Sequence, residues 1–100
     1  MEFQIRQMDI NDKEEVLAMM QEFYSSDAVH TNGSRAIFER DFQNCIIENP
    51  YLKGYIFELN AQILGYAMTA RSFSTEFGKP CLWFEDLYLK PQYRGCGIIS

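Results

Sequence analysis

The stretch that decides the fold lies at residues 83–100 and is Trp83-Phe84-Glu85-Asp86-Leu87-Tyr88-Leu89-Lys90-Pro91-Gln92-Tyr93-Arg94-Gly95-Cys96-Gly97-Ile98-Ile99-Ser100. An apolar strand runs into a proline, then into an Arg-Gly-x-Gly loop, and then into the start of a helix. Glycines let a backbone turn tightly and approach a ligand without a Cβ clash. The N–H groups at a helix start have no internal partners and favour anions. The stretch therefore predicts a loop that holds phosphate oxygens.

This loop differs from the two best-known phosphate-binding motifs. It lacks the Gly-Lys-Ser/Thr ending of a P-loop, and it lacks the GxGxxG pattern of dinucleotide-binding folds. Taken alone, Gly-x-Gly is also compatible with a plain turn. A protein that binds a different phosphate-containing ligand is a further interpretation of this loop. The preceding strand and proline favour the ligand-binding interpretation.

The residues before this stretch predict an α+β (mixed α/β) fold with a largely antiparallel sheet. Hydrophobic periodicity gives the order β-α-α-β-β-β. The expected elements are a strand at about 2–8, helices at about 12–24 and 35–48, and strands at about 55–59, 62–72 and 81–90. No repeat or linker interrupts them, so residues 1–100 form a single domain.

Local signals place the ends of these elements and their buried faces. Asn11 followed by Glu14 resembles a capping box for the first helix, and Ser34 can cap the second. The expected inward positions are Val16, Leu17, Met20, Phe23 and Tyr24 on the first helix, Phe38, Phe42, Cys45 and Ile46 on the second, and Leu64, Tyr66, Met68 and Ala70 on the third strand.

Composition excludes several classes of protein. The net charge is −5 and 47% of residues are hydrophobic, which disfavours nucleic-acid binding and disorder. No apolar run is long enough to span a membrane, and the first residues do not form a signal peptide. The three cysteines lack CxxC spacing, so they predict reduced thiols in a cytoplasmic protein and no metal site.

The loop and the element order together resemble the N-terminal portion of the GNAT superfamily of N-acetyltransferases. Gln92, Gly95 and Gly97 fit the family pattern Gln/Arg-x-x-Gly-x-Gly/Ala. The register that starts at Arg94 also fits at Gly97, but Ile99 stands where a glycine or alanine is usual. The resemblance covers all 100 residues, and its specific motifs lie in residues 83–97.

The resemblance implies an acetyl-CoA-dependent enzyme that acetylates a primary amine of a small acceptor. In the family, the backbone of the fourth strand pairs with the pantetheine arm, and the loop holds the pyrophosphate. The residues that would bind acetyl-CoA here are Leu87, Leu89, Gln92, Arg94, Gly95, Cys96, Gly97 and Ser100.

The same resemblance places the chemistry beside a β-bulge in the fourth strand. Strict alternation would put Glu85 and Asp86 on opposite faces among apolar neighbours, and a bulge would re-aim both side chains. Glu85 is the candidate general base, because partial desolvation would raise its pKa. It could instead be a solvated residue or a structural partner of Lys90 or Arg94, and Asp86 is the alternative carboxylate.

Acceptor recognition in the family lies between the first two helices. This implies acceptor contacts for Tyr24, Asp27 and His30, although helix-end or exposed polar residues have the same appearance. Family members continue through another helix, a fifth strand and further elements, so we expect a truncated domain. The alternative function is a non-catalytic module that self-associates as a homodimer, or pairs with a partner, through its exposed fourth strand.

Overall fold

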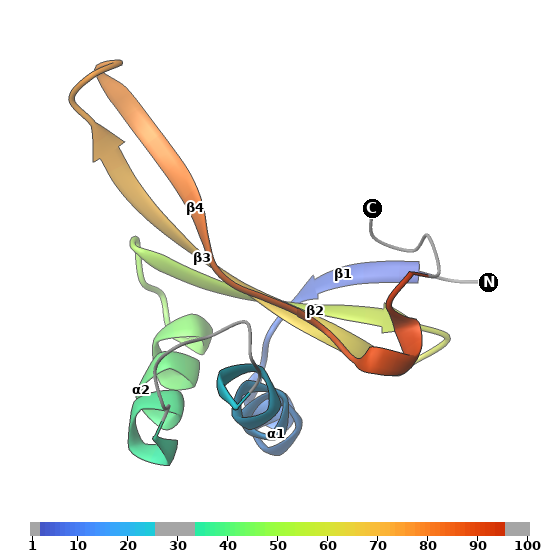
Figure 1. The fold of residues 1–100 in the computed structure, drawn as a ribbon. Coiled ribbons are helices and arrows are strands. Elements are labelled where there is room, and N and C mark those ends of the chain that lie inside the picture. The colour runs from blue at the N-terminus through green and yellow to red at the C-terminus, as the bar shows by residue number, and fades with distance from the viewer. Residues whose placement is uncertain (1–2, 26–33, 96–100) are drawn as a thin grey trace.

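A computed structural model describes residues 3–25 and 34–95 of the chain. In it, two helices lie on one face of a four-stranded sheet (Figure 1). The elements are β1 (Phe3–Gln7), the short 3₁₀ helix η1 (Ile10–Asp12), α1 (Lys13–Tyr24), α2 (Arg35–Ile46), β2 (Leu52–Leu59), β3 (Gln62–Ser74), β4 (Lys79–Leu89) and the 3₁₀ helix η2 (Pro91–Tyr93). The predicted order β-α-α-β-β-β is confirmed.

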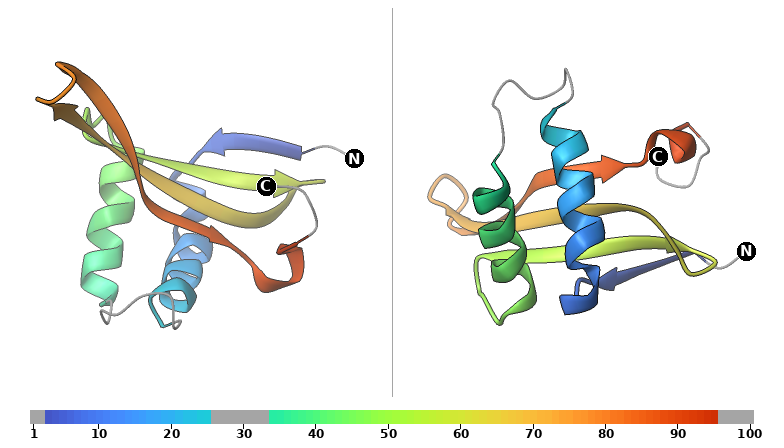
Figure 2. Two further views of the ribbon diagram at one scale, coloured as in Figure 1. Left: turned by 45° about the horizontal axis from the view of Figure 1, so that its top comes forward. Right: turned by 90° about the horizontal axis from the view of Figure 1, so that it is seen from below.

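The sheet has the order β1-β2-β3-β4, and all three pairings are antiparallel. Asn60 and Ala61 form the tight turn between β2 and β3, with φ angles of 51° and 66°. Such positive φ angles are those of a two-residue hairpin turn. The far end of the β3–β4 hairpin extends beyond both helices (Figure 2). β4 is an edge strand of this sheet.

The main core fills the space between the helices and the sheet. The predicted inward residues Val16, Leu17, Met20, Phe38 and Phe42 are all buried there. Phe23, Tyr24, Cys45 and Ile46 are partly buried and pack against this core. The hydrophobic periodicity therefore identified the inner faces of both helices correctly.

One inward residue of β3 was assigned to the wrong face. Ile63 lies opposite Glu58 and Gly65 lies opposite Phe57, so Leu64 is an extra residue in β3. Such a bulge breaks the alternation of side chains along a strand. Leu64 accordingly packs with Phe57 and Ala67 in a second cluster and not with Tyr66 in the main core.

The predicted cap of the first helix was also wrong. The capping box is formed instead by Asp9 and Asp12, at the start of η1, the 3₁₀ helix that precedes α1. The Asp9 carboxylate accepts from the Asn11 N–H, and the Asp12 carboxylate accepts from the Asp9 N–H, both at 2.8 Å. The cap at Ser34 is confirmed, because its hydroxyl accepts from the Ile37 N–H at 3.2 Å.

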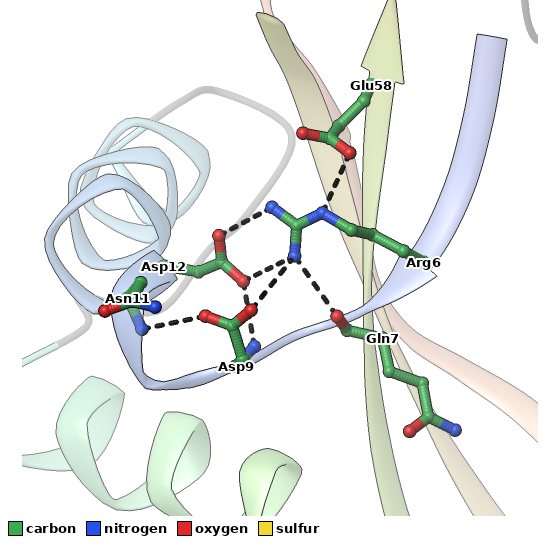
Figure 3. A network of polar contacts seen from close by, with 6 residues as sticks. All are labelled: Arg6, Gln7, Asp9, Asn11, Asp12 and Glu58. Carbon is green, nitrogen blue, oxygen red and sulfur yellow. Dashed lines mark hydrogen bonds and ion pairs between the residues drawn. The ribbon is translucent and has the colours of Figure 1, made fainter. Parts of the chain in front are cut away.

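Arg6 fixes the start of the helical layer to the sheet (Figure 3). Its guanidinium donates to both oxygens of Asp12 at 2.7 and 2.8 Å and to Glu58 of β2 at 2.8 Å. Asp12 is only 4% exposed, so its charge depends on this bidentate pairing. The hydrogen bond from Arg6 holds the pKa of Asp12 below its usual value.

We expect Asp12→Asn to reduce the free energy of unfolding at pH 7 by about 2–3 kcal/mol, because Arg6 loses a buried charged partner. The folded-state pKa of Asp12 is depressed, so its contribution is present above the unfolded value of about 3.9 and is lost as pH falls through the folded value. Urea unfolding at pH 7, 4 and 3 measures this. Glu14→Gln, at a largely exposed ion pair, is the control. A difference that does not shrink at low pH would contradict the assignment.

Candidate active site

A β-bulge at Glu85 shapes the middle of β4. Asp86 lies opposite Met68, whereas Phe84 lies opposite Thr69, so Glu85 has no partner residue on β3. The expected bulge is confirmed. In a regular strand, adjacent side chains point to opposite faces. Here both Glu85 and Asp86 line the same cavity on the helix side of the sheet.

This cavity has a volume of about 310 Å³. It lies where the end of α1, the middle of α2 and the start of β2 meet β3 and β4. The lining residues are Tyr24, Asp41, Tyr51, Leu52, Met68, Ala70, Glu85 and Asp86. Three carboxylates therefore surround an otherwise apolar and aromatic space, and none of the described lining residues is basic. Such a cavity suits a small cationic ligand.

Asp86 is the most deeply placed of the three carboxylates, at 3% exposure. The hydroxyls of Tyr24 and Tyr66 donate to its two oxygens, each at 2.8 Å. These bonds offset the loss of water around a buried charge. Burial and the Asp86 carboxylate together raise the pKa of both tyrosines, so the hydroxyls stay protonated as donors at neutral pH.

Glu85 differs from its predicted environment. It is exposed and does not show the partial desolvation that we expected. It has no hydrogen bond or ion pair to any described residue, so the structural-partner interpretation finds no support there. Lys90 instead pairs with Glu15. Glu85 is thus a carboxylate at the cavity wall that is available to a ligand.

The described part of the predicted phosphate loop begins with η2. The Arg94 guanidinium donates to the Leu89 carbonyl at 2.6 Å and lies 5.2 Å from the centre of the Tyr88 ring. These contacts attach the loop to the end of β4. Gly95 has a φ of 76°, a conformation that side chains other than glycine rarely adopt. Gln92 precedes it in η2, whereas Cys96, Gly97 and Ser100 lie outside the described residues.

The two predicted pantetheine positions lie on the edge strand. Leu87 is half exposed, and Leu89 is partly buried against the second cluster around Phe57. Because β4 has β3 on one side and no neighbour among the described strands on the other, its outer backbone groups can pair with an extended ligand. The cavity, the bulge and the loop are thus ordered along one strand.

The structure adds two residues that the sequence analysis missed. Of the three predicted acceptor contacts, Tyr24 lines the cavity, while Asp27 and His30 lie outside the described residues. Asp41 was not among the predicted site residues, and Tyr66 was predicted only as an inward residue of the third strand. Asp41 follows Phe38 by three positions, which places a charge on the inward stripe of α2, and this signal could have identified it.

The described residues contain no group of three histidine, cysteine or acidic side chains that could hold a metal ion. Cys45 and Cys81 are free thiols, and burial raises the pKa of Cys45 to about 12. Within residues 3–25 and 34–95, no helix is long and apolar enough to cross a membrane.

The sequence profile described as the acetyltransferase (GNAT) family matches residues 14–100. No curated protein matches the chain. Several solved structures share its fold. An integron cassette protein from the mobile metagenome of Cole Harbour Salt Marsh has 22% identity and a TM-score of 0.80, with 94% of this chain and 60% of that chain covered.

Two further solved structures contain ligands. A predicted acetyltransferase from Clostridium acetobutylicum with acetyl-CoA has 24% identity and a TM-score of 0.74, covering 97% of this chain and 66% of that one. AAC(6')-Iy in complex with the bisubstrate analog CoA-S-monomethyl-acetylneamine has 15% identity and a TM-score of 0.76, covering 98% of this chain and 64% of that one. This chain therefore spans somewhat less than two thirds of the length of these structures.

We expect Tyr66→Phe to destabilise the fold by about 1.5–3 kcal/mol, because it removes one of two donors to a buried carboxylate. Chemical unfolding at pH 7 measures the change. Tyr93→Phe is the matched control, since its hydroxyl makes only a 3.3 Å bond to Gln62 at the surface. Equal, small effects of the two substitutions would show that the Tyr66–Asp86 bond does not support the site.

Proposed function

Because the chain belongs to the GNAT family of acetyltransferases, we propose that it is an acetyl-CoA-dependent N-acetyltransferase acting on the primary amine of a small acceptor. One observation supports this most strongly: a single edge strand connects a cavity with three carboxylates, a bulge and the glycine-containing loop. The free thiols Cys45 and Cys81 agree with a reducing, cytoplasmic location.

The residues present fit acetyl-CoA. The outer edge of β4 at Leu87 and Leu89 offers backbone groups to the pantetheine arm, as an added strand would need. In this proposal the loop of Gln92, Arg94, Gly95, Cys96, Gly97 and Ser100 would supply backbone N–H groups to the pyrophosphate. When bound, acetyl-CoA supplies a thioester carbonyl to an amine held in the adjacent cavity.

In this proposal the protein aligns the amine and removes its proton. A bond would form from the neutral amine nitrogen to the acetyl carbon, the carbon–sulfur bond would break with coenzyme A leaving as its thiolate, and the amine nitrogen would lose a proton. Glu85 accepts that proton, directly or through water, because it faces the cavity and has no partner among the described residues. Tyr24 and Asp86 form the adjacent wall and position the acceptor.

A second candidate function, a self-associating module, is favoured by the exposure of β4. Leu82, Trp83 and Phe84 are 60–64% exposed on an edge strand. Unpaired strand edges with exposed apolar side chains promote association. In this alternative, a second copy covers β4 as a homodimer, and the cavity has no catalytic role.

We expect the 100-residue chain to bind acetyl-CoA with micromolar affinity, and Gly97→Asp to weaken this binding at least tenfold through charge repulsion and loss of close backbone approach. Isothermal titration calorimetry measures both affinities. Thr75→Asp adds the same negative charge at an exposed position of the β3–β4 turn and should bind like the parent chain. Equal affinities of the parent chain and Gly97→Asp would refute the assigned loop.

Sedimentation of the calorimetry sample separates the two candidate functions. The enzyme proposal expects acetyl-CoA binding whatever the oligomeric state. A folded dimer with no affinity for acetyl-CoA would favour the module.

We expect Glu85→Gln to lower kcat for a primary amine by about 10²-fold or more with little change in the KM for acetyl-CoA, because the general base is removed. Steady-state kinetics with the chain measures both constants. Glu76→Gln, in the exposed β3–β4 turn, is the control. An unchanged kcat would remove Glu85 from the mechanism.

A further inference from the structure

Asp41 is a charged residue at an inward position of α2. It is partly buried next to Phe42 on the face that covers the sheet. It has no hydrogen bond or ion pair to a described residue, and the neighbouring Glu39 instead pairs with Arg35. Burying a carboxylate without a partner costs free energy. A fold tolerates such a residue most readily where a ligand supplies the missing charge.

The environment of Asp41 is strongly acidic. Burial raises its pKa, and the charges of Asp86 and Glu85 raise it further, although Arg40 acts in the opposite direction. The two tyrosine hydroxyls satisfy Asp86 directly, whereas Glu85 and Asp41 are left without partners among the described residues. Both of them line the 310 Å³ cavity. A positive ligand in this cavity would relieve the repulsion among the three carboxylates.

The two unpaired carboxylates come from different layers of the fold. Glu85 comes from the bulge in β4, the strand along which the pantetheine arm is proposed to pair. Asp41 comes from α2 in the helical layer. A ligand with one amine at Glu85 leaves Asp41 available for a second positive group. The apolar residues Leu52, Met68 and Ala70 line the cavity with them and suit a short methylene chain.

We infer that the acceptor is a diamine or polyamine, with one amine presented to Glu85 for acetylation and a second ammonium group bound by Asp41. This inference rests on the proposed function, since it assigns the acceptor class of the same site. Asp41 is then a specificity residue and not a catalytic one. It distinguishes acceptors by their number of positive charges, because a monoamine of equal length cannot occupy both carboxylates at once.

The matched pair 1,4-diaminobutane and n-butylamine tests this inference, since the two differ only in the second ammonium group. Heteronuclear NMR titration of the chain at fixed ionic strength measures both affinities. We expect the diamine to bind about tenfold more tightly than the monoamine, and Asp41→Asn to abolish this preference while leaving n-butylamine binding within about twofold. Glu39→Gln removes the same charge from the same helix outside the cavity and should keep the preference.

Equal affinity for the two amines in the parent chain, or a preference that survives Asp41→Asn, would overturn the inference. Acetyl-CoA affinity measured on the same samples distinguishes a failure of the acceptor class from a failure of the proposed function. A parent chain that binds acetyl-CoA but shows no diamine preference would refute the acceptor class and leave the proposed function standing. Diamine preference without acetyl-CoA binding would support the Asp41 site and refute the proposed function.

Discussion

The extra residue in β4 at Glu85 determines the geometry of the candidate site. Without it, Asp86 and Glu85 would point to opposite sides of the sheet, and one of them would lie on the face that the helices do not cover. With it, both carboxylates reach the helix-side cavity. The helices form the other wall of this cavity, so the position of α1 on the sheet, which Arg6 and Asp12 fix, also contributes to the geometry of the candidate site.

A buried carboxylate is costly unless its surroundings satisfy it, and Asp86 shows how this fold does so. Tyr24 comes from the end of α1 and Tyr66 from the middle of β3, so the helical layer and the sheet each contribute one donor. The Tyr24–Asp86 bond also joins two residues that line the cavity. The hydrogen bonds to Asp86 therefore contribute both to the stability of the fold and to the geometry of the site, which is common where a site lies between two layers.

The opposite face of the sheet is less completely packed. Among the described residues, a small cluster around Phe57, Leu64 and Ala67 is buried there, and apolar side chains such as Ile5 and Leu87 are exposed. Three solved structures that share this fold are longer than the chain, which covers 60–66% of their length. Apolar surface of this extent is normally covered by other protein, whether within one chain or between chains. The edge of β4 has the same property and is also where the proposed cofactor would pair.

Sequence by itself determined the order of the elements, the inner faces of α1 and α2, and the loop with Gln92, Arg94 and Gly95, because helical periodicity and turn residues act over short distances. It also indicated that β4 could not alternate regularly. The face of Leu64, the capping box at Asp9 and Asp12, and the hydrogen bond from Tyr66 to Asp86 were not obtained in this way, and the sequence placed Asp41 on the inward stripe of α2 without its cavity neighbours. Only the tertiary structure decided these features, because strand register and the meeting of α2 with β4 depend on contacts between residues far apart in the chain.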